Sequence, residues 1–114
     1  MDVSTIVGQE LVAVEFVQDF LQLRFDGPLL TLFEWPHVMA TEASMAFGEP
    51  GYRDALCAQI GEEVTAAALE EGDALTIEFA NGMVIGLSLR MEDLAVPEAG
   101  FYSESGAAAD QVEF

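Results

Sequence analysis

Alternation of apolar and polar residues along the chain predicts two groups of β-strands. Leu21, Leu23 and Phe25 alternate with polar side chains, which is typical of a half-buried strand. The first group of predicted strands spans residues 11–16, 20–25 and 29–35, and the second spans 64–69, 74–79 and 83–89. Turn-forming sequences such as Asn81-Gly82 separate consecutive strands, so we expect each group to form a meander of hairpins.

A helix of about ten residues is predicted between the two groups of strands. Pro50 suits the first position of a helix, and Gly61 suits the position just after its end. Apolar residues recur between these limits at helical spacing and predict a buried stripe. The residues of this stripe are Tyr52, Ala55, Leu56 and Ile60.

The two groups of strands resemble each other in sequence. Aligning residues 6–11 with residues 59–64 places Leu21-x-Leu23-x-Phe25 over Leu75-x-Ile77-x-Phe79, with one inserted residue near Gly72. The matching halves are about residues 6–35 and 59–90. We therefore predict an α+β fold of two β-meander repeats in the order βββ-α-βββ, with one central helix and pseudo-twofold symmetry.

The length of 114 residues is that of one domain. We place this domain at residues 1–102 and predict a flexible C-terminal tail at 103–114, where small residues follow one another. The sequence contains neither an apolar run long enough to span a membrane nor a basic N-terminal region followed by an apolar stretch. The expected location is therefore cytoplasmic, without a membrane partner.

The charge of the chain is strongly one-sided. Twenty-one acidic residues face three arginines and no lysine, so the formal net charge is −18. Direct binding of nucleic acid or of an anionic membrane is not expected, because phosphate contacts are made by clustered Arg and Lys. The excess instead favours a basic protein partner. Imitation of DNA by this surface is the alternative, and it requires most of the acids to gather on one face.

Several residues on the predicted outward side of the strands are apolar, which is unusual for a solvated sheet face. They are Leu11, Ala13, Phe20, Val64, Ala66 and Ala68. The central helix, the second half of the chain folding over as a sandwich, or a second copy of the chain would cover such a face. The last of these alternatives predicts a homodimer.

Residues with catalytic or metal-binding chemistry are scarce. Cys57 lies within the predicted helix, where a thiol is usually an inert packing group, and one cysteine with one histidine, His37, cannot form a common zinc site. The paired acids lie at turns and element ends, where water surrounds them. We therefore predict neither catalytic residues, nor a metal site, nor a cofactor. A cleft between the halves near Trp35, His37 and Tyr102 is the enzymatic or ligand-binding alternative.

The leading hypothesis is a non-enzymatic binding protein that steers onto a basic surface by acidic turns and holds it by exposed aromatic side chains. The predicted partner-binding residues are Glu62, Glu63, Glu70, Glu71, Asp73, Trp35 and Tyr102. Over about residues 6–99 the chain, with Gly61-x-x-Val64 and Phe79-x-Asn81-Gly82, resembles uncharacterised acidic bacterial families of two β-rich halves. Some of these families resemble immunity proteins of toxin systems, which implies an inhibitory protein-binding role.

Overall fold

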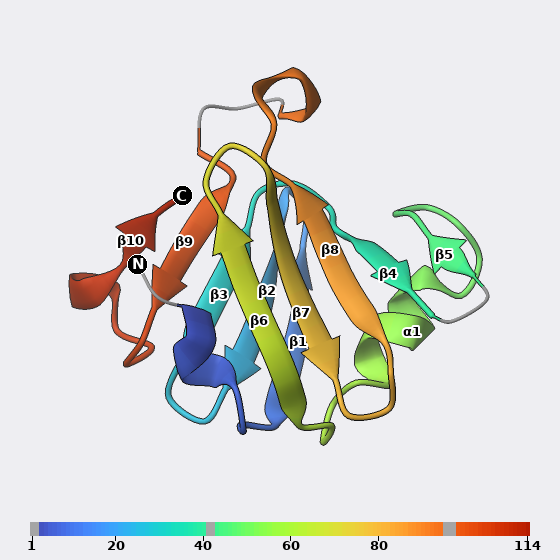
Figure 1. Cartoon of the computed structure of the whole chain (residues 1–114), viewed down its shortest axis with the longest axis horizontal. Helices are drawn as coiled ribbons and strands as arrows, with labels where there is room; N and C mark the ends of the chain where they lie inside the picture. The colour runs from blue at the N-terminus through green and yellow to red at the C-terminus, as the bar shows by residue number, and fades with distance from the viewer. Residues whose placement is uncertain (1–2, 41–42, 95–97) are drawn as a thin grey trace.

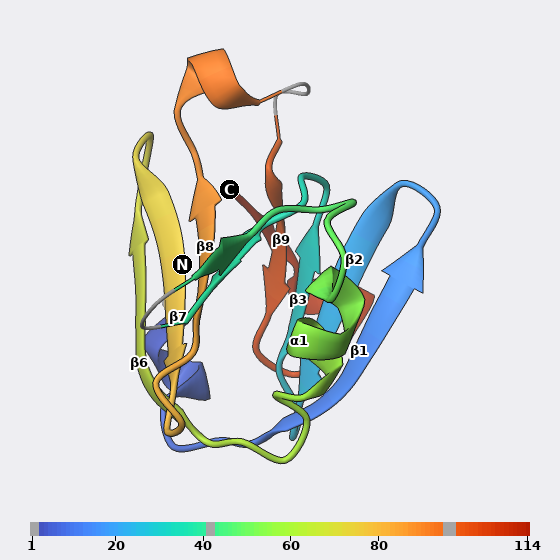
Figure 2. The same cartoon turned by 90° about the vertical axis from the view of Figure 1, so that its right-hand side faces the viewer.

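The computed structural model describes residues 3–40, 43–94 and 98–114, which form a β-rich domain of two antiparallel five-stranded sheets. The sheets face each other as two layers (Figures 1 and 2). The first sheet has the order β1-β2-β3-β9-β10, with β1 at Leu11–Val17, β2 at Phe20–Phe25, β3 at Leu29–Leu32, β9 at Gly100–Ser103 and β10 at Val112–Glu113. The second has the order β5-β4-β8-β7-β6, with β5 at Ser44–Met45, β4 at His37–Met39, β8 at Val84–Ser88, β7 at Ala74–Phe79 and β6 at Val64–Glu70.

Two predicted features are present in this fold, namely the three-stranded meanders β1-β2-β3 and β6-β7-β8 and the helix between them. Helix α1 spans Tyr52–Cys57 and is shorter than expected. The helix ends early because the residues after it pair with β1, where Gly61 N donates to the Leu11 carbonyl at 2.8 Å. Ile60, predicted in the buried stripe, is consequently 45% exposed, whereas Tyr52 and Leu56 are buried as expected.

The strand that follows each meander crosses to the other sheet. Strand β4 comes after β3 but pairs with β8, and β9 comes after β8 but pairs with β3. Each crossing strand then forms a hairpin with a two-residue edge strand, β5 or β10. These four strands were not predicted, because two to four residues are too few to show an alternating pattern.

A β-bulge in the first strand of each meander corrects the predicted direction of two side chains. The register shifts between Leu11 and Ala13 in β1 and between Val64 and Ala66 in β6. One extra residue moves the side chains before it to the opposite face. Leu11 and Val64 were expected to point outward, but they are 1% and 0% exposed, while the bulge residue Val12 is 56% exposed.

The core lies between the two sheets and draws buried side chains from both. Leu21, Leu23 and Leu30 come from the first sheet, and Leu75 and Ile77 come from the second. Three covers were considered for the apolar residues of the predicted outward side. For Leu11 and Val64, the cover is the second half of the chain, which folds over as a sandwich and includes them in this core. Burying leucine and isoleucine side chains stabilises the fold by about 1.5–3 kcal/mol each.

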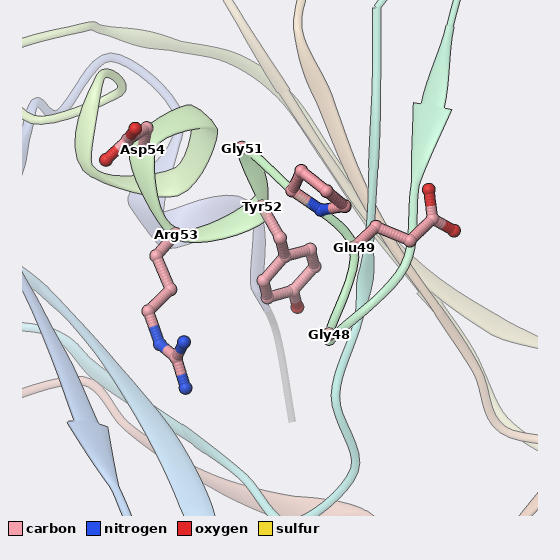
Figure 3. Close-up of a pocket in the computed structure, with 7 residues that line it drawn as sticks. Gly48, Glu49, Gly51, Tyr52, Arg53 and Asp54 are labelled. Carbon is pink, nitrogen blue, oxygen red and sulfur yellow. The ribbon is translucent and has the colours of Figure 1, made fainter.

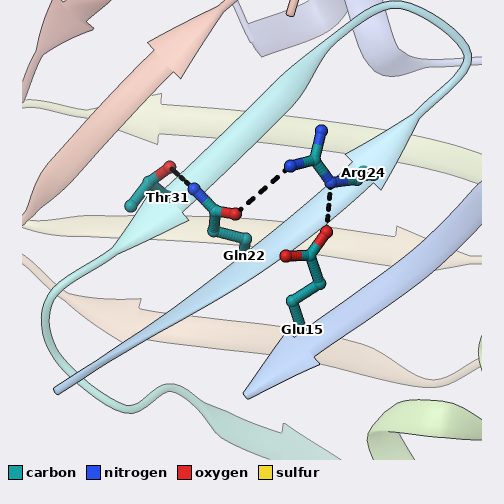
Figure 4. Close-up of polar contacts among 4 residues, drawn as sticks. All are labelled: Glu15, Gln22, Arg24 and Thr31. Atoms are coloured by element: carbon teal, nitrogen blue, oxygen red, sulfur yellow. Dashed lines mark hydrogen bonds and ion pairs between the residues drawn. The ribbon is translucent and has the colours of Figure 1, made fainter. Parts of the chain in front are cut away.

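The outer face of the first sheet combines polar pairs with an aromatic group. Gln22 donates to Thr31, and Arg24 forms an ion pair with Glu15, as Figure 4 shows. At the end of these strands Phe33 makes edge-to-face contacts with Phe20 and with Phe101, at centroid distances of 6.0 and 5.3 Å. Phe20, expected to point outward, is thus half-buried among rings of its own face.

Residues 103–114, for which the sequence predicts a flexible tail, make regular contacts with the first sheet. Strand β10 pairs with β9, and Ala99 N donates to the Phe114 carbonyl at 2.8 Å. Ser103 donates to the Asp110 carboxylate, and Ser105 N donates to the same group at 3.2 Å. Local side-chain hydrogen bonds of this kind give a small-residue segment a defined path.

Among the residues that the structure describes, no helix is both long and apolar enough to cross a bilayer.

Candidate protein-binding surface

The carboxylates of the described residues lie at the surface, since none of them belongs to the buried set. Two of them form ion pairs with arginine, Glu15 with Arg24 and Asp73 with Arg90. Both pairs are exposed, so each contributes only about 0–1 kcal/mol to stability. The negative charge of the described residues is therefore presented to solvent.

One group of acids lies at the end of the sandwich where β6 turns into β7 and where the 3-10 helix η2, Met91–Asp93, follows β8 (Figure 1). We call it the acidic rim, and it consists of Glu70, Glu71, Asp73, Glu92 and Asp93, all exposed. The Leu89 N–H donates to the Asp73 carbonyl at 2.8 Å, which fixes the two segments side by side. Five carboxylates here face one nearby guanidinium, that of Arg90.

Two of the predicted binding residues lie at the other end of β6. Glu62 and Glu63 precede β6, and Glu63 forms an isolated bridge with Glu10. Glu70 is the last residue of this seven-residue strand, so at about 3.3 Å per residue it lies roughly 20 Å from Glu63. The structure therefore divides the predicted acidic residues between two ends of the sandwich.

Trp35 lies in a cluster of aromatic rings beside α1, together with Phe16 and Phe47, and is not an exposed anchor. Its ring stacks on Phe47 at 4.1 Å and on Phe16 at 6.3 Å, and Trp35 is half-buried. The Arg53 guanidinium lies 5.6 Å from the centroids of both Phe16 and Phe47, a cation–π arrangement. Phe47 is 42% exposed.

A cavity of about 290 Å³ adjoins this aromatic cluster and is lined by residues 48–54. Figure 3 shows Arg53 and Tyr52 extending to one side of α1 and Asp54 to the other. The Tyr52 hydroxyl donates to the Pro36 carbonyl at 2.5 Å, and burial raises the pKa of Tyr52 to about 12. Tyr52 thus ties α1 to the β3–β4 connection that carries Trp35.

Tyr102 differs from the predicted exposed anchor. It is 2% exposed and its hydroxyl shares a hydrogen bond with Thr5. Its ring belongs to the hydrophobic core between the sheets. The alternation within β9 places Phe101, not Tyr102, on the outer face.

An apolar pocket of about 250 Å³ opens beside the acidic rim. Its lining is Leu69, Glu71, Gly72, Leu89, Met91, Leu94, Ala99 and Phe114. Met91, one of the lining residues, is 89% exposed. The pocket therefore combines an apolar interior with a flexible, adaptable thioether at its mouth and carboxylates around it.

A third cavity, of about 350 Å³, lies near two of the residues named for the predicted cleft. It is lined by Glu34, Trp35, His37, Leu87, Ser88 and Asp93. Ser88 donates its hydroxyl proton to Asp93 at 2.6 Å. In a serine–histidine–acid triad the hydroxyl donates to the histidine instead, so this geometry does not prepare Ser88 as a nucleophile. Tyr102 is not part of the lining.

Cys57 is the last residue of α1 and is exposed, not packed within a longer helix as predicted. Among the residues that the structure describes, no group of three or more His, Cys, Asp and Glu side chains is arranged to hold a metal ion.

The residues that form the apolar pocket were not predicted from the sequence. Leu69 comes from β6, Met91 from η2 and Phe114 from the segment after β10, so no local pattern unites them. Two adjacent features were visible, namely Met91 between charged residues and the acids on either side of Gly72.

Comparisons with protein-family models, with curated proteins and with solved structures found no match to this chain.

Proposed function

We propose that this protein is a non-enzymatic binding module of the immunity or inhibitor class, which docks on a basic protein surface through the acidic rim. The observation that carries the proposal is the position of Glu70, Glu71 and Glu92, exposed acids on two adjoining segments. Asp73 and Asp93 lie beside them, and Arg90 is the nearby cation. Charges of one sign on a small surface attract an oppositely charged partner and raise its association rate, by roughly 10–10³-fold.

The spread of the acids favours a protein partner over imitation of DNA. The chain exposes 6085 Å², so its 21 acids average about 290 Å² each. A DNA duplex carries one phosphate per ~1.7 Å of axis, which on a cylinder of about 10 Å radius is about 100 Å² per charge. Acids also stand at the opposite end of β6, where Glu10, Glu63 and Glu78 are exposed.

A charge-matched pair of variants tests the proposal. The rim variant carries Glu70→Gln, Glu71→Gln and Glu92→Gln, and the control carries Glu10→Gln, Glu63→Gln and Glu78→Gln. The two variants have the same net charge and differ only in where the charge is removed. The affinity for a labelled oligolysine peptide is measured by fluorescence anisotropy over a series of salt concentrations.

We expect the rim variant to bind oligolysine more weakly and with a shallower salt dependence than the control variant, because rim charges contribute mainly through long-range attraction. Equal losses in the two variants would show that net charge alone attracts the peptide. That result would contradict a dedicated binding surface at the rim.

We also propose that the chain is an internal duplication with pseudo-twofold symmetry. The corresponding strands β1 and β6 have seven residues each, and β2 and β7 have six. Both first strands carry their bulge opposite the end of the second strand. The sheet orders also correspond when β4-β5 and β9-β10 exchange places, which supports a duplication in which the fourth and fifth strands are swapped between the halves.

A further inference from the structure

The strand pairing places Phe16 and Leu69 at corresponding positions in the two sheets. Phe16 pairs with Leu21 and Leu69 pairs with Leu75, and both Leu21 and Leu75 are core residues of the second strand of a meander. Leu69 therefore occupies in the second sheet the place that Phe16 occupies in the first.

Phe47 and Phe114 correspond in the same way. Each lies two positions after the edge-strand residue that pairs with a core residue of the crossing strand. That residue is Met45, which pairs with Val38, in the first case and Val112, which pairs with Tyr102, in the second. Phe114 packs partly against the core and lines the apolar pocket.

The two halves differ in what lies between the corresponding residues, Phe16 and Phe47 in the first half and Leu69 and Phe114 in the second. Between Phe16 and Phe47 stands the indole of Trp35, stacked on both rings. Leu69 and Phe114 instead line the open pocket of about 250 Å³. In the first half, an aromatic side chain fills the space between Phe16 and Phe47. In the second half, the corresponding space between Leu69 and Phe114 is an open pocket.

We propose that the apolar pocket receives one large aromatic side chain from a basic segment of the partner protein, which the acidic rim attracts. This inference rests on the proposed function and adds the chemistry of the residue that the surface holds. The volume lies below the roughly 300–1,000 Å³ of typical small-molecule sites and suits a single side chain. Glu71 in the lining disfavours an anionic lipid and favours cationic residues on both sides of the inserted ring.

The pocket also has the composition of an interface anchor site. Its lining includes the buried residues Leu89 and Ala99 and the exposed residue Met91. Sulfur–aromatic contact and desolvation of the ring would both favour binding. Binding energy at protein interfaces is concentrated in such anchors, with tryptophan and tyrosine prominent among them.

Two labelled peptides test the inference on the full chain. One is a short oligolysine with a single central tryptophan, and the other has serine in place of that tryptophan. The pocket variants are Met91→Gln, which changes an exposed side chain, and Phe114→Ala. The control is Val12→Gln, because Val12 is an exposed apolar residue near the other end of the sandwich. Affinities are measured by fluorescence anisotropy, and light scattering gives the mass of each variant.

We expect the wild type and Val12→Gln to bind the tryptophan peptide roughly tenfold more tightly than the serine peptide. In Met91→Gln and Phe114→Ala, the ratio of the affinity for the tryptophan peptide to that for the serine peptide should fall towards one. The affinity for the serine peptide itself should equal that of the wild type. The rim variant should weaken binding of both peptides and keep the ratio.

Each other result has a distinct meaning. Equal, salt-sensitive binding of the two peptides by the wild type would overturn the inference and leave the proposed function standing. Failure of both peptides to bind at low salt would overturn both. A tryptophan preference that survives in both pocket variants would place the ring elsewhere and overturn the inference. A dimer that dissociates on Met91→Gln would show that a second copy fills the pocket, which also overturns it.

Discussion

The buried hydroxyl of Tyr52 links the stability of this protein to alkaline pH. It donates to the Pro36 carbonyl at 2.5 Å, Tyr52 is 2% exposed, and burial raises its pKa from 10.0 to about 12. The folded state therefore favours the protonated phenol more strongly than the unfolded chain does. The associated stability is fully present below pH 10 and is lost as the pH rises through about 12.

The substitution Tyr52→Phe removes the hydroxyl and retains the ring. At neutral pH the lost hydrogen bond costs about 0.5–1.5 kcal/mol. The two pKa values imply that the wild type itself loses about 1 kcal/mol by pH 11 and about 2 kcal/mol by pH 12, a loss that the variant does not share. The difference in unfolding free energy should therefore shrink above pH 10 and change sign near pH 11.

Urea unfolding of the two proteins, followed by circular dichroism at a series of pH values from neutral to 12, measures this difference. Tyr102 and the carboxylates are present in both proteins, so their effects cancel in the comparison. A constant difference between wild type and Tyr52→Phe across the whole range would refute the argument, because it would mean that Tyr52 titrates alike in the folded and unfolded states.

Two further predictions concern the first sheet and the segment after it. Gly100→Ala should lower the unfolding free energy by about 1–3 kcal/mol or more, because the added Cβ overlaps the backbone carbonyl of Thr31. Gly86→Ala should cost less in the same urea unfolding assay, since its Cβ meets only the flexible end of the Met39 side chain. Hydrogen bonds from serines hold the pKa of Asp110 below its ordinary 3.8, so the order of residues 103–114 should be lost as the pH falls below that value. Amide hydrogen exchange should show this loss, and Asp110→Asn should abolish its pH dependence.

The first two strands of each meander were predictable because six or seven residues are long enough to show alternation. Leu21-x-Leu23-x-Phe25 and Leu75-x-Ile77-x-Phe79 both lie in strands as expected, and each has its three apolar residues buried. The bulges were not predictable, since a single extra residue leaves the composition of a strand unchanged and reverses the side chains before it. The exchange of β4 and β9 depends on pairing between distant segments, which a local pattern does not record.

The candidate surface was predicted only in part. Glu70, Glu71 and Asp73 were recognised from their charge and their position at a turn. The apolar pocket was missed because Leu69 and Phe114 are distant in sequence, and Leu69 reads as one position of an ordinary strand. Tyr102 was chosen for its residue type, yet the alternation of β9 directs its side chain into the core.

Mapping a basic ligand onto the protein tests the central claim most directly. Oligolysine is titrated into the isotopically labelled full chain, and the shift of each backbone amide is followed by nuclear magnetic resonance. We expect the largest shifts at residues 70–73 and 91–93, with smaller shifts in the variant that carries Glu70→Gln, Glu71→Gln and Glu92→Gln. Shifts that are largest around Glu10 and Glu63, or equal over both ends of the sandwich, would contradict it.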